Sequence, residues 1–494
     1  MLSLTDDFDI LITAEQAWPA LERAVLKAEH SVTAGFRIFD MDTRLRSEEG
    51  RAVGDTWFDL LAHVLGKGVR VTLSVSDFDP VMAPDLHSLS MRTVKQGEEL
   101  AVAVNPKADQ LRVAAHLHPA KAGMLPWLGF LPFVKKKQLE ARKKIKKAGA
   151  DGEPSKRLWH RMPAMNPATH HQKVAVIDDD ILYIGGLDLN ERRYDSTNHD
   201  RPAAETWSDI QVLLRGPEAK AAKRHLDTYR SVTEGRAAVP DCPGLKRTLS
   251  APRRFQMPFL SPRTLLNEIE EAHVAAFKRA KKLIYIETQF LRSSVIAETL
   301  AEAGARSPDL TSVIVLPALP EDVAFDRSDS LDAKYGLSLA EDAIQTVQEA
   351  FGSRLTLAVP VQPRLADRDS FETLAGSPVI HVHNKVLVQD DAYALIGSAN
   401  LNGRSMRWDT ELAVEITDPS RVDRARAGLL QHWWHQPLPK EAMDPTTLQP
   451  WWAERIKRNG VSLPENRSGF LVPFDVEQHA RMGQPLPGVT EDVV

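Results

Sequence analysis

The sequence predicts an α/β protein made of two fused, pseudo-symmetric α/β/α sandwich repeats. Three observations lead to this prediction: one short motif occurs twice, the same order of helices and strands returns in each half, and a proline-rich segment separates the halves. Alternating helices and strands are typical of layered folds in which helices cover a sheet. Because two repeats would then build one site, we expect the active site at the seam between them.

The first half begins with a predicted helix. Residues 14 to 29 carry apolar side chains, Trp18 and Leu21 among them, at the 3.6-residue period of a helix. The segment SVTAGFRIFD then predicts a strand, residues 57 to 65 a second helix, and GVRVTLSVSDFD the next strand. The alternation therefore starts before the first copy of the motif.

The second half repeats this order. Residues 267 to 282, NEIEEAHVAAFKRAKK, predict a helix, and LIYIETQF and DLTSVIVLPALPED supply the strands that follow. Between the halves, residues 237 to 262 contain five prolines and little periodicity. Such a stretch interrupts regular structure, which places the boundary near residue 250.

Three parts of the chain follow from this boundary. We expect an N-terminal repeat at residues 1 to 250, a C-terminal repeat at 251 to 435, and a C-terminal extension at 436 to 494 that packs on the core. Two tryptophan pairs, at 433–434 and 451–452, are interpreted as packing anchors of the extension. The Pro, Gly and acidic residues beyond them predict a tail with little regular structure.

The composition is that of a soluble globular protein, with 43% hydrophobic and 26% charged residues. The formal charge of −5, from 62 Lys and Arg against 67 Asp and Glu, gives no overall bias toward nucleic acid. Cys242 is the only cysteine, which excludes an intramolecular disulfide framework and any cysteine-based metal cluster. This composition suits a reducing compartment.

The N-terminus, MLSLTDDFDILIT, carries acidic residues where a signal peptide has basic ones. No stretch approaches the run of about 18 apolar residues that predicts a membrane span. We therefore expect a cytoplasmic protein or one bound peripherally to the inner membrane. Export by machinery that needs no cleavable signal stays open.

The repeated motif combines a histidine, a lysine two residues on and an aspartate five residues further. The copies consist of His171, Lys173 and Asp178 in HQKVAVID, and of His383, Lys385 and Asp390 in HNKVLVQD. Residues two apart on a strand share a face, so each copy offers one imidazole and one ammonium group to a shared pocket. Both aspartates have the opposite parity, and we expect them to anchor their own strand ends.

The residues after each motif match as well. An apolar strand leads to a turn of small residues, which includes Gly186 or Ser398, and then to Asp188 or Asn400. Small residues let backbone N–H groups approach an anion. A carboxylate facing a phosphate would repel it, so Asp188 is expected to bind a lysine, a substrate hydroxyl or a choline-like headgroup. His170 points to the opposite face by parity and is expected in the core.

On these residues the chain resembles the phospholipase D superfamily, whose signature is HxKxxxxD followed by a GG or GS turn, present twice. The surroundings HHQK, GGLDL, RRYD, WSDI and RGP look most like the eukaryotic-type phospholipases D, which also occur in bacteria. The segment IYIETQF looks like the strand that opens the second half of those enzymes. The resemblance spans roughly residues 30 to 430 and implies repeats of the phospholipase D type.

The resemblance implies catalysis without a metal or another cofactor. The two lysines can hold the non-bridging oxygens of a phosphodiester and stabilise charge in the transition state. By resemblance, His171 is the nucleophile that forms a phosphohistidine, and His383 is the general acid and base. The sequence itself does not rank the two histidines, so reversed roles stay open. It contains no HExxH or EF-hand pattern that would indicate a metal.

Each histidine needs a carboxylate on its far nitrogen to fix its tautomer. In related enzymes an acidic residue downstream of each motif serves this purpose, and the matching positions are Asp209 and Glu411. Asp195 and Asp409 lie nearby and are competitors for this role. The predicted substrate-binding residues are Asn400, Ser398, Gly186 and Asp188.

A segment before the first motif indicates a membrane contact. An apolar stretch with Trp127, Phe130 and Phe133 precedes a basic run, residues 135 to 147, in which eight Lys or Arg residues stand against one Glu. Apolar groups beside a basic run are typical of an interfacial anchor on anionic lipid. A packed connector followed by a solvated basic helix is the alternative.

The sequence therefore predicts a metal-independent phospholipase D that releases phosphatidic acid and a headgroup alcohol, with transphosphatidylation as a second outcome of the same intermediate. The expected partners are the phospholipid substrate and a membrane surface, and no nucleic acid. A monomer suffices, because one chain carries both motifs. The alternatives are a phosphatidyltransferase resembling cardiolipin synthase, a nuclease or other phosphodiesterase, and a catalytically silent membrane-binding module. A secreted antibacterial lipase would share the first chemistry.

Overall fold

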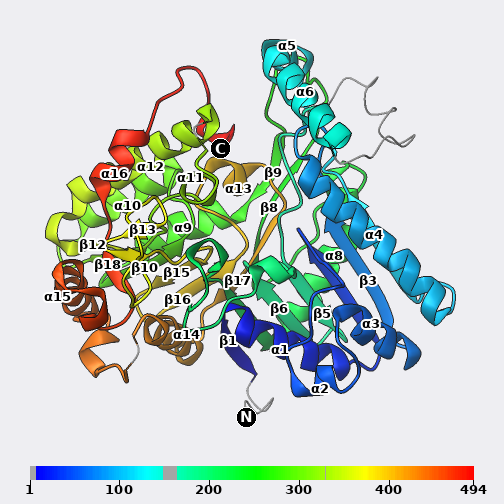
Figure 1. The fold of residues 1–494 in the computed structure, drawn as a ribbon, viewed down its shortest axis with the longest axis horizontal. Helices are drawn as coiled ribbons and strands as arrows, with labels where there is room; N and C mark the ends of the chain where they lie inside the picture. Colours follow the sequence, from blue (N-terminus) through cyan, green and yellow to red (C-terminus); the bar gives the residue numbers. More distant parts are fainter. Residues whose placement is uncertain (1–6, 148–163, 329, 435, 494) are drawn as a thin grey trace.

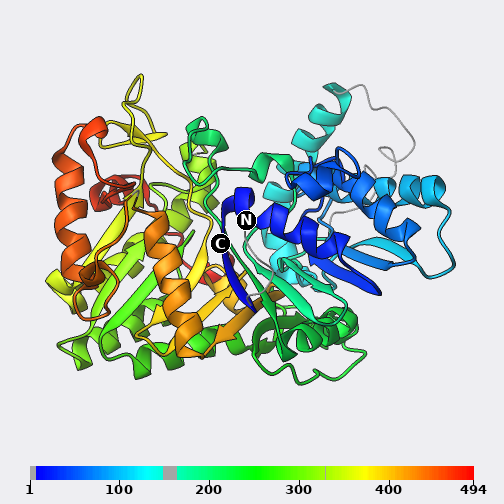
Figure 2. The same cartoon turned by 90° about the horizontal axis from the view of Figure 1, so that it is seen from below.

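The structure is a computed structural model that describes residues 7 to 147, 164 to 328, 330 to 434 and 436 to 493. Two large sheets stand side by side, one in each lobe of the molecule (Figure 1). Figure 2 shows the same two lobes from below, with the first half on the right in both views. The predicted α/β fold with two repeats is confirmed.

The first sheet has seven strands. Their order is β1 (Phe8–Ile12), β7 (Ile210–Arg215), β6 (Ile181–Gly185), β5 (Val174–Ile177), β2 (Ser31–Phe36), β3 (Arg70–Ser76) and β4 (Leu111–His116). Strands β2, β3 and β4 are parallel, whereas β5 runs antiparallel to β2. The end of β2 and the start of β5 therefore lie at the same edge of the sheet.

The second sheet has nine strands and repeats this order. Its strands are β18 (Leu471–Pro473), β12 (Leu355–Pro360), β11 (Thr311–Val315), β10 (Leu283–Thr288), β15 (Lys385–Gln389), β16 (Tyr393–Gly397), β17 (Glu411–Ile416), β8 (Leu245–Ala251) and β9 (Arg263–Asn267). Without β18 and β9, every strand has an equivalent in the first sheet. Strand β10 matches β2, β15 matches β5 and β8 matches β1. A separate hairpin joins β13 (Thr373–Leu374) to β14 (Ser377–Pro378).

Helices cover the outer face of each sheet (Figure 1). In the first half these are α1 (Thr13–Leu26), α2 (Glu48–Arg51), α3 (Trp57–Gly66) and α4 (Pro84–Val104). In the second half they are α9 (Glu268–Arg279), α10 (Ser294–Arg306), α11 (Glu321–Ala324), α12 (Leu331–Phe351) and α13 (Gly403–Arg407). Each set encloses its own apolar core, with Trp18 and Trp57 in the first and Phe277 and Phe351 in the second.

A third core fills the seam between the sheets. It combines Val176 and Val212 of the first sheet with Tyr285 and Val388 of the second. Helices α8 (Pro217–Thr233) and α14 (Pro419–His432), one from each half, add side chains to it. The two inner sheet faces therefore bury each other, and the halves form one apolar unit.

The chain crosses between the halves earlier than predicted. Strand β8, which covers residues 245 to 251, pairs antiparallel with β17 of the second sheet. The segment that the sequence assigned to the end of the first repeat thus opens the second sheet. Proline-rich composition marked the connection but not the strand inside it, because LKRTLSA alternates too weakly to stand out.

The C-terminal extension packs on the second half. Helix α15 (Leu448–Val461) joins the seam core through Trp452, and Trp434 and Trp451 form an aromatic cluster with it, with ring centroids 5.0 Å to 5.7 Å apart. The tail is more regular than expected, because β18 adds an edge strand to β12 and α16 (Val476–Met482) follows.

The remaining elements are short or project from the lobes. Helices α5 (Met124–Gly129) and α6 (Leu131–Lys147) extend beyond the first lobe (Figure 1). Single-turn helices are η1 (Glu191–Arg193), η2 (Ala203–Glu205), η3 (Gly352–Arg354), η4 (Lys440–Ala442), η5 (Pro464–Asn466) and η6 (Glu491–Val493). Within the described ranges, none of the helices combines the length and apolar character needed to cross a bilayer.

Candidate active site

The two motifs meet at the seam between the sheets. Each histidine lies in an extended segment just before β5 or β15, and these segments pair with the opposite half. The backbone N–H of His171 donates to the Thr410 carbonyl at 2.9 Å, and that of His383 donates to the Ser208 carbonyl at 2.8 Å. Both halves of the predicted site are therefore held together by backbone hydrogen bonds.

Each motif histidine contacts a carboxylate from the other half. Nδ1 of His171 lies 2.9 Å from Oε1 of Glu411, and Nδ1 of His383 lies 2.6 Å from Oδ2 of Asp209. Both carboxylates have 0% side-chain exposure. The contacts leave Nε2 of each ring for chemistry. Both predicted carboxylates thus reach a histidine. Each one serves the motif of the opposite half, because each motif segment pairs with the strand end across the seam.

The two competing carboxylates have other partners. Asp195 accepts a hydrogen bond from Nδ1 of His199 at 2.6 Å, away from the motif histidines. Asp409 accepts the backbone N–H of Thr169 at 2.6 Å and pairs with Arg404 at 3.1 Å. Both therefore serve to fix loops around the site.

The small residues after each motif lie beside the carboxylates. The Ser398 hydroxyl donates to Glu411 and accepts the backbone N–H of Leu412 at 3.1 Å. At Gly186, an added Cβ would lie only 2.1 Å from Oδ1 of Asp209, so a larger residue would displace that carboxylate. The structure gives Gly186 and Ser398 a supporting position, and their contact with substrate stays a prediction.

Both motif lysines are buried at the site, with Lys173 0% and Lys385 5% exposed. Nζ of Lys173 donates to the carbonyl of His171 at 2.6 Å, and Lys385 makes the same contact with His383. Asp188 lies 3.9 Å from Nζ of Lys173. Each ammonium group keeps donors for a further oxygen ligand, because an ammonium carries three N–H bonds.

Burial controls the protonation of these groups. It lowers the pKa of His171 and of His383 well below the usual value, and the two lysines add to the effect. It raises the pKa of Asp209 to about 7 and of Glu411 to about 8, although the lysines oppose this. It also lowers the pKa of Lys385 to about 7. The substrate-free site therefore favours neutral groups, and a bound anion would favour the cationic forms.

The motif aspartates lie at the other end of the strands. Asp178 accepts the backbone N–H groups of residues 29 to 31, and Asp390 accepts those of residues 281 to 283. Each carboxylate thereby anchors the start of the neighbouring strand, β2 or β10, and stays away from the reacting centre. The parity of the motif had indicated this distance, but not that the anchored strand is the neighbour.

The two halves differ in charge at equivalent positions. Oδ1 of Asp188 accepts the Ile38 N–H at 2.9 Å, while Oδ1 of its equivalent Asn400 is buried and has no hydrogen-bond partner among the described residues. Strand β2 pairs with β5 as β10 pairs with β15, which makes Arg37 the equivalent of Gln289. The first half therefore presents charged groups where the second presents amides.

Arg37 adds a cation that sequence reasoning missed. It follows β2 at the edge where the motifs meet, and its guanidinium lies 5.5 Å from the Phe78 ring. Besides burial, it contributes to the lowered pKa of His171 and Lys173. Within the described part of the chain, its guanidinium has no carboxylate partner at salt-bridge distance. No motif surrounds Arg37, so only the fold reveals its place.

Three more side chains surround His383. The Trp207 ring lies 4.6 Å from the His383 ring and 4.8 Å from the His381 ring, and its Nε1–H donates to Asp209 at 3.3 Å. The guanidinium of Arg193 lies 3.5 Å from the Trp207 ring centroid. Strand parity could have indicated two of these residues, because His381 precedes His383 by two positions and Trp207 precedes Asp209 by two.

A short helix of the second half reaches over to the first. Glu321, at the start of α11, lies 2.7 Å from Arg192 and 3.4 Å from Arg193. The Arg193 guanidinium is thereby held against Trp207, on the side of the site where His383 lies.

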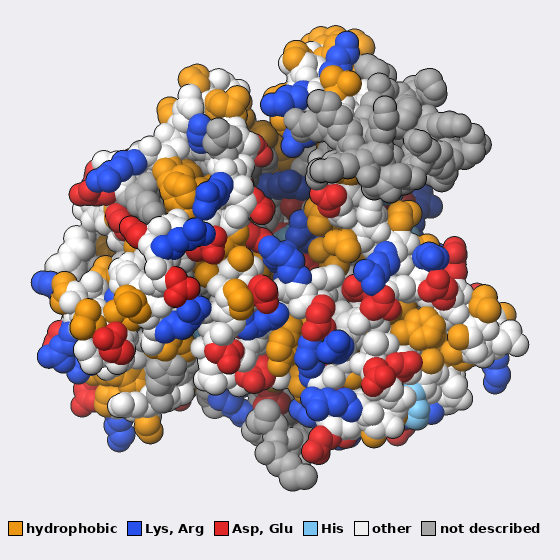
Figure 3. All heavy atoms as spheres, viewed as in Figure 1, with side chains coloured by type: hydrophobic (Ala, Val, Ile, Leu, Met, Phe, Trp, Pro, Cys, Tyr) orange, Lys and Arg blue, Asp and Glu red, His pale blue; other side chains and the backbone are white. Residues whose placement is uncertain are grey.

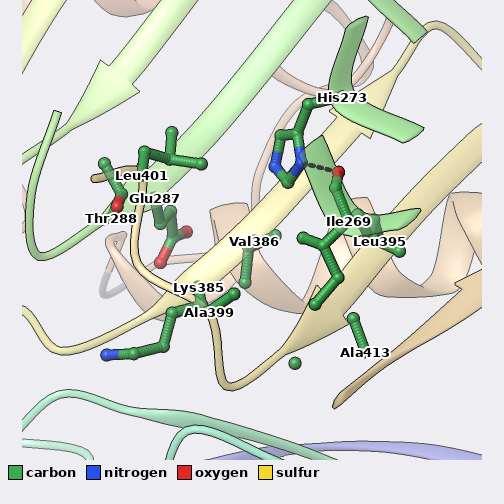
Figure 4. A pocket seen from close by; sticks show the side chains of 11 residues that line it. Ile269, His273, Glu287, Thr288, Lys385, Val386, Leu395, Ala399, Leu401 and Ala413 are labelled. Atoms are coloured by element: carbon green, nitrogen blue, oxygen red, sulfur yellow. Dashed lines mark hydrogen bonds between the residues drawn. The ribbon is translucent and has the colours of Figure 1, made fainter. Parts of the chain in front are cut away.

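A small pocket behind Lys385 is separate from this site. It lies between α9 and strands β10, β15 and β16. Figure 4 shows the Lys385 ammonium pointing away from His273, whose Nδ1–H donates to the Ile269 carbonyl at 2.8 Å. Burial lowers the pKa of His273 to about 4, so this histidine is neutral.

His170 is a core residue, as parity predicted, with Nδ1 2.8 Å from the Thr410 hydroxyl.

Comparison with known proteins finds similarity to phospholipases D and to a phospholipase D-like domain. Residues 273 to 433 match the family model described as cardiolipin synthase, phospholipase D-like domain. Phospholipase D1 of Schizosaccharomyces pombe is 23% identical over 355 residues, which cover 52% of this chain and 26% of that protein. Phospholipase D alpha 1 of Nicotiana tabacum is 24% identical over 417 residues, covering 57% of this chain and 50% of that protein. The chain thus spans half the length of these relatives or less.

A crystal structure has the same overall fold. Phosphatidylserine synthase of Haemophilus influenzae Rd KW20 aligns over 92% of this chain and 94% of its own, with a TM-score of 0.53 and 13% sequence identity. The similarity supports the two-repeat architecture.

In the described residues, no group of three or more His, Cys, Asp or Glu side chains is arranged to hold a metal ion.

Proposed function

Because the chain belongs to the phospholipase D superfamily, we propose that it hydrolyses the headgroups of glycerophospholipids, releasing phosphatidic acid and an alcohol. One observation carries the proposal: two histidines, each on a buried carboxylate of the opposite half, face the seam beside two buried lysines. This set contains a nucleophile, an acid and the cations that a phosphodiester anion requires.

The first step forms a covalent intermediate. Neutral Nε2 of His171 attacks phosphorus, the P–O bond to the headgroup breaks, and an N–P bond forms. Lys173 and Lys385 neutralise the non-bridging oxygens, and the proton on Nε2 of His383 passes to the departing alcohol. The low pKa of His171, caused first by burial, keeps its nucleophilic nitrogen free of a proton.

The second step regenerates the enzyme. His383, now neutral, takes a proton from water, whose oxygen attacks phosphorus and breaks the N–P bond. Asp209 accepts from Nδ1 of His383 and stabilises the imidazolium, while Glu411 orients His171 in the same way. An alcohol in place of water would give a transferred phosphatidyl group.

A phosphatidyltransferase is the second candidate. The two motif histidines are only 8% and 6% exposed, which restricts the access of bulk water to the intermediate. Restricted water favours capture by a bound alcohol over hydrolysis. Both activities share every step up to the phosphohistidine, so the acceptor decides between them.

The test is lipid turnover by the purified protein. Vesicles of phosphatidylcholine and phosphatidylethanolamine would be supplied with excess EDTA and a few per cent ethanol, in parallel with added glycerol. We expect phosphatidic acid and phosphatidylethanol from the wild type, and neither from His171→Ala or His383→Ala. His63→Asn, an exposed histidine in α3, is the matched control and should keep full activity.

The products separate the candidates. Phosphatidic acid as the main product supports hydrolysis, whereas a phosphatidyl alcohol formed almost alone supports the transferase. Turnover that persists in both histidine variants would contradict the proposed site. Salt-sensitive cleavage of DNA, with no lipid product under any condition, would favour a nuclease instead.

A further inference from the structure

We propose that the projecting end of the first lobe inserts into the surface of an anionic lipid bilayer. This region, called the apolar tip below, comprises α5, residues 131 to 139 of α6 and the loop at residues 253 to 259. Its exposed apolar side chains are Met124, Leu125, Leu128, Phe133, Leu139, Phe255, Met257 and Phe259. The proposal concerns where the protein binds and stands apart from the chemistry at the seam.

The apolar tip concentrates exposed hydrophobic surface. Over the described residues, 17 large hydrophobic side chains are exposed, and eight of them belong to the tip. Phe255 is 63% exposed and Met124 55%. Figure 3 shows hydrophobic side chains gathered at this end of the molecule, with Lys and Arg beside them. Soluble proteins rarely leave such a cluster uncovered unless it binds something.

The sequence located only part of this surface. Of the three predicted contacts, Phe133 is exposed, whereas Trp127 and Phe130 are half-buried. The loop at residues 253 to 259 belongs to the stretch that the sequence predicts as the connection between the halves. It lies more than 100 residues after α5 in the sequence. The basic run predicted at 135 to 147 begins in α6, and its side chains from residue 140 onward lie outside the described residues.

Backbone hydrogen bonds fix the two segments of the tip together. The N–H of Gly123 donates to the Phe259 carbonyl at 2.8 Å, and the N–H of Leu125 donates to the Met257 carbonyl at 3.0 Å. A Cβ on Gly123 would lie 1.9 Å from the Gln256 carbonyl oxygen, so glycine is required for this approach. The apolar side chains therefore project from a built platform.

The topology places the tip at the edge that carries the site. Strand β4 runs parallel to β2, and the tip begins shortly after β4 ends at His116. The motif lysine Lys173 enters β5 at this same edge, because β5 is antiparallel to β2. Figure 3 shows the molecule hollowed between the tip and the opposite lobe, with basic side chains in the hollow. A membrane bound at the tip would thus face the sheet edge where the motifs meet.

Charge favours a bilayer as the occupant over a second copy of this chain. Residues 119 to 139 and 252 to 262 contain Lys121, Lys135, Lys136, Lys137, Arg253 and Arg254, and no Asp or Glu. A second copy would bring the same cations together, whereas anionic headgroups complement them. Apolar side chains ringed by cations suit the boundary between headgroups and acyl chains.

The test is co-sedimentation with vesicles of phosphatidylcholine containing 30% phosphatidylglycerol, and with phosphatidylcholine alone. We expect the wild type to bind the anionic vesicles at least ten-fold more tightly, since each basic residue near the surface contributes about five-fold. Leu128→Glu with Phe255→Glu should lower that binding at least ten-fold. Val102→Glu with Val461→Glu changes two valines elsewhere that are even more exposed, 85% and 88%, and should leave it unchanged.

Two readouts separate a docking defect from other failures. Near-ultraviolet circular dichroism checks that the tip variant is folded. Turnover of a short-chain, monomeric phosphodiester should equal that of the wild type, because the seam is untouched. Vesicle binding by a protein that turns over no lipid would leave the inference standing and overturn the proposed function. Equal vesicle binding by tip and control variants, or a wild-type dimer that the tip substitutions dissociate without any vesicle binding, would overturn the inference.

Discussion

At the scale of single residues, the site depends on two carboxylates that never need to touch substrate. Asp209 and Glu411 each hold the Nδ1 nitrogen of a histidine from the opposite half. We expect Asp209→Asn and Glu411→Gln to lower kcat roughly 10- to 100-fold, as loss of a positioning partner typically does, with little change in KM. Asp227→Asn, at an exposed carboxylate of α8 that pairs with Lys223, should keep kcat near the wild-type value. Steady-state kinetics on a monomeric substrate would check this, and an unchanged kcat in both site variants would refute the roles.

A second residue-scale prediction concerns pH. Burial, aided by the Lys173 charge, lowers the pKa of Lys385 to about 7 in the substrate-free enzyme. Lys385 is therefore cationic below this value and loses its proton as the pH rises through it, so kcat/KM should fall on the alkaline side. A guanidinium stays charged, and Lys385→Arg should move the alkaline limb upward. A wild-type profile that stays flat to pH 9 would contradict the assignment.

At the scale of elements, the two repeats fill the space behind their motifs with side chains of different sizes. Behind the first motif, Gln172 packs against Gly35 of β2; behind the second, Asn384 donates to Glu287 at the equivalent place in β10. A longer amide faces a glycine in one half, and a shorter amide faces a longer acid in the other. The space behind each motif is thus filled by complementary sizes.

The element-scale prediction is that Glu287 stabilises the second repeat. This buried carboxyl accepts hydrogen bonds from Tyr285, Asn384 and Trp433. Glu287→Ala would leave several buried donors without an acceptor, which costs roughly 1 to 3 kcal/mol each, so we expect a loss of at least about 3 kcal/mol in the free energy of unfolding. Urea denaturation would measure it, with exposed Glu271→Ala as the control. Equal stability of the two variants would show that the network is dispensable.

At the scale of the whole molecule, the seam makes the halves interdependent. Strands of both sheets share one buried core, and α8 and α14, one from each half, add side chains to it. We expect one cooperative unfolding transition by calorimetry. Fragments 1 to 244 and 245 to 494, expressed separately, should lack fixed tertiary structure because each exposes its share of that core. Two transitions, or independently folded fragments, would contradict a shared core.

The sequence predicted the features that local patterns encode and missed those that depend on contacts between distant segments. The duplicated motif, strand parity and helix periods led to the fold and to the placing of His171 and His383. Which carboxylate serves which histidine could not be predicted, because no local pattern tells which half supplies the partner. Arg37 and the strand β8 were missed for the same reason. The roles of a single arginine and of a weakly alternating seven-residue segment become visible only when distant segments pair.

The most direct test of the central claim is to trap the covalent intermediate. The substrate would be a phosphatidyl ester of an acidic phenol, because such a phenol leaves without being protonated. The His383→Ala variant should therefore still form the adduct but should release it slowly. Mass spectrometry of the quenched, digested protein should find the phosphatidyl group on His171, and none on His171→Ala. An adduct on His383 in the His171 variant would reverse the assigned roles. Turnover with no adduct on either histidine would contradict the proposed covalent chemistry at the seam.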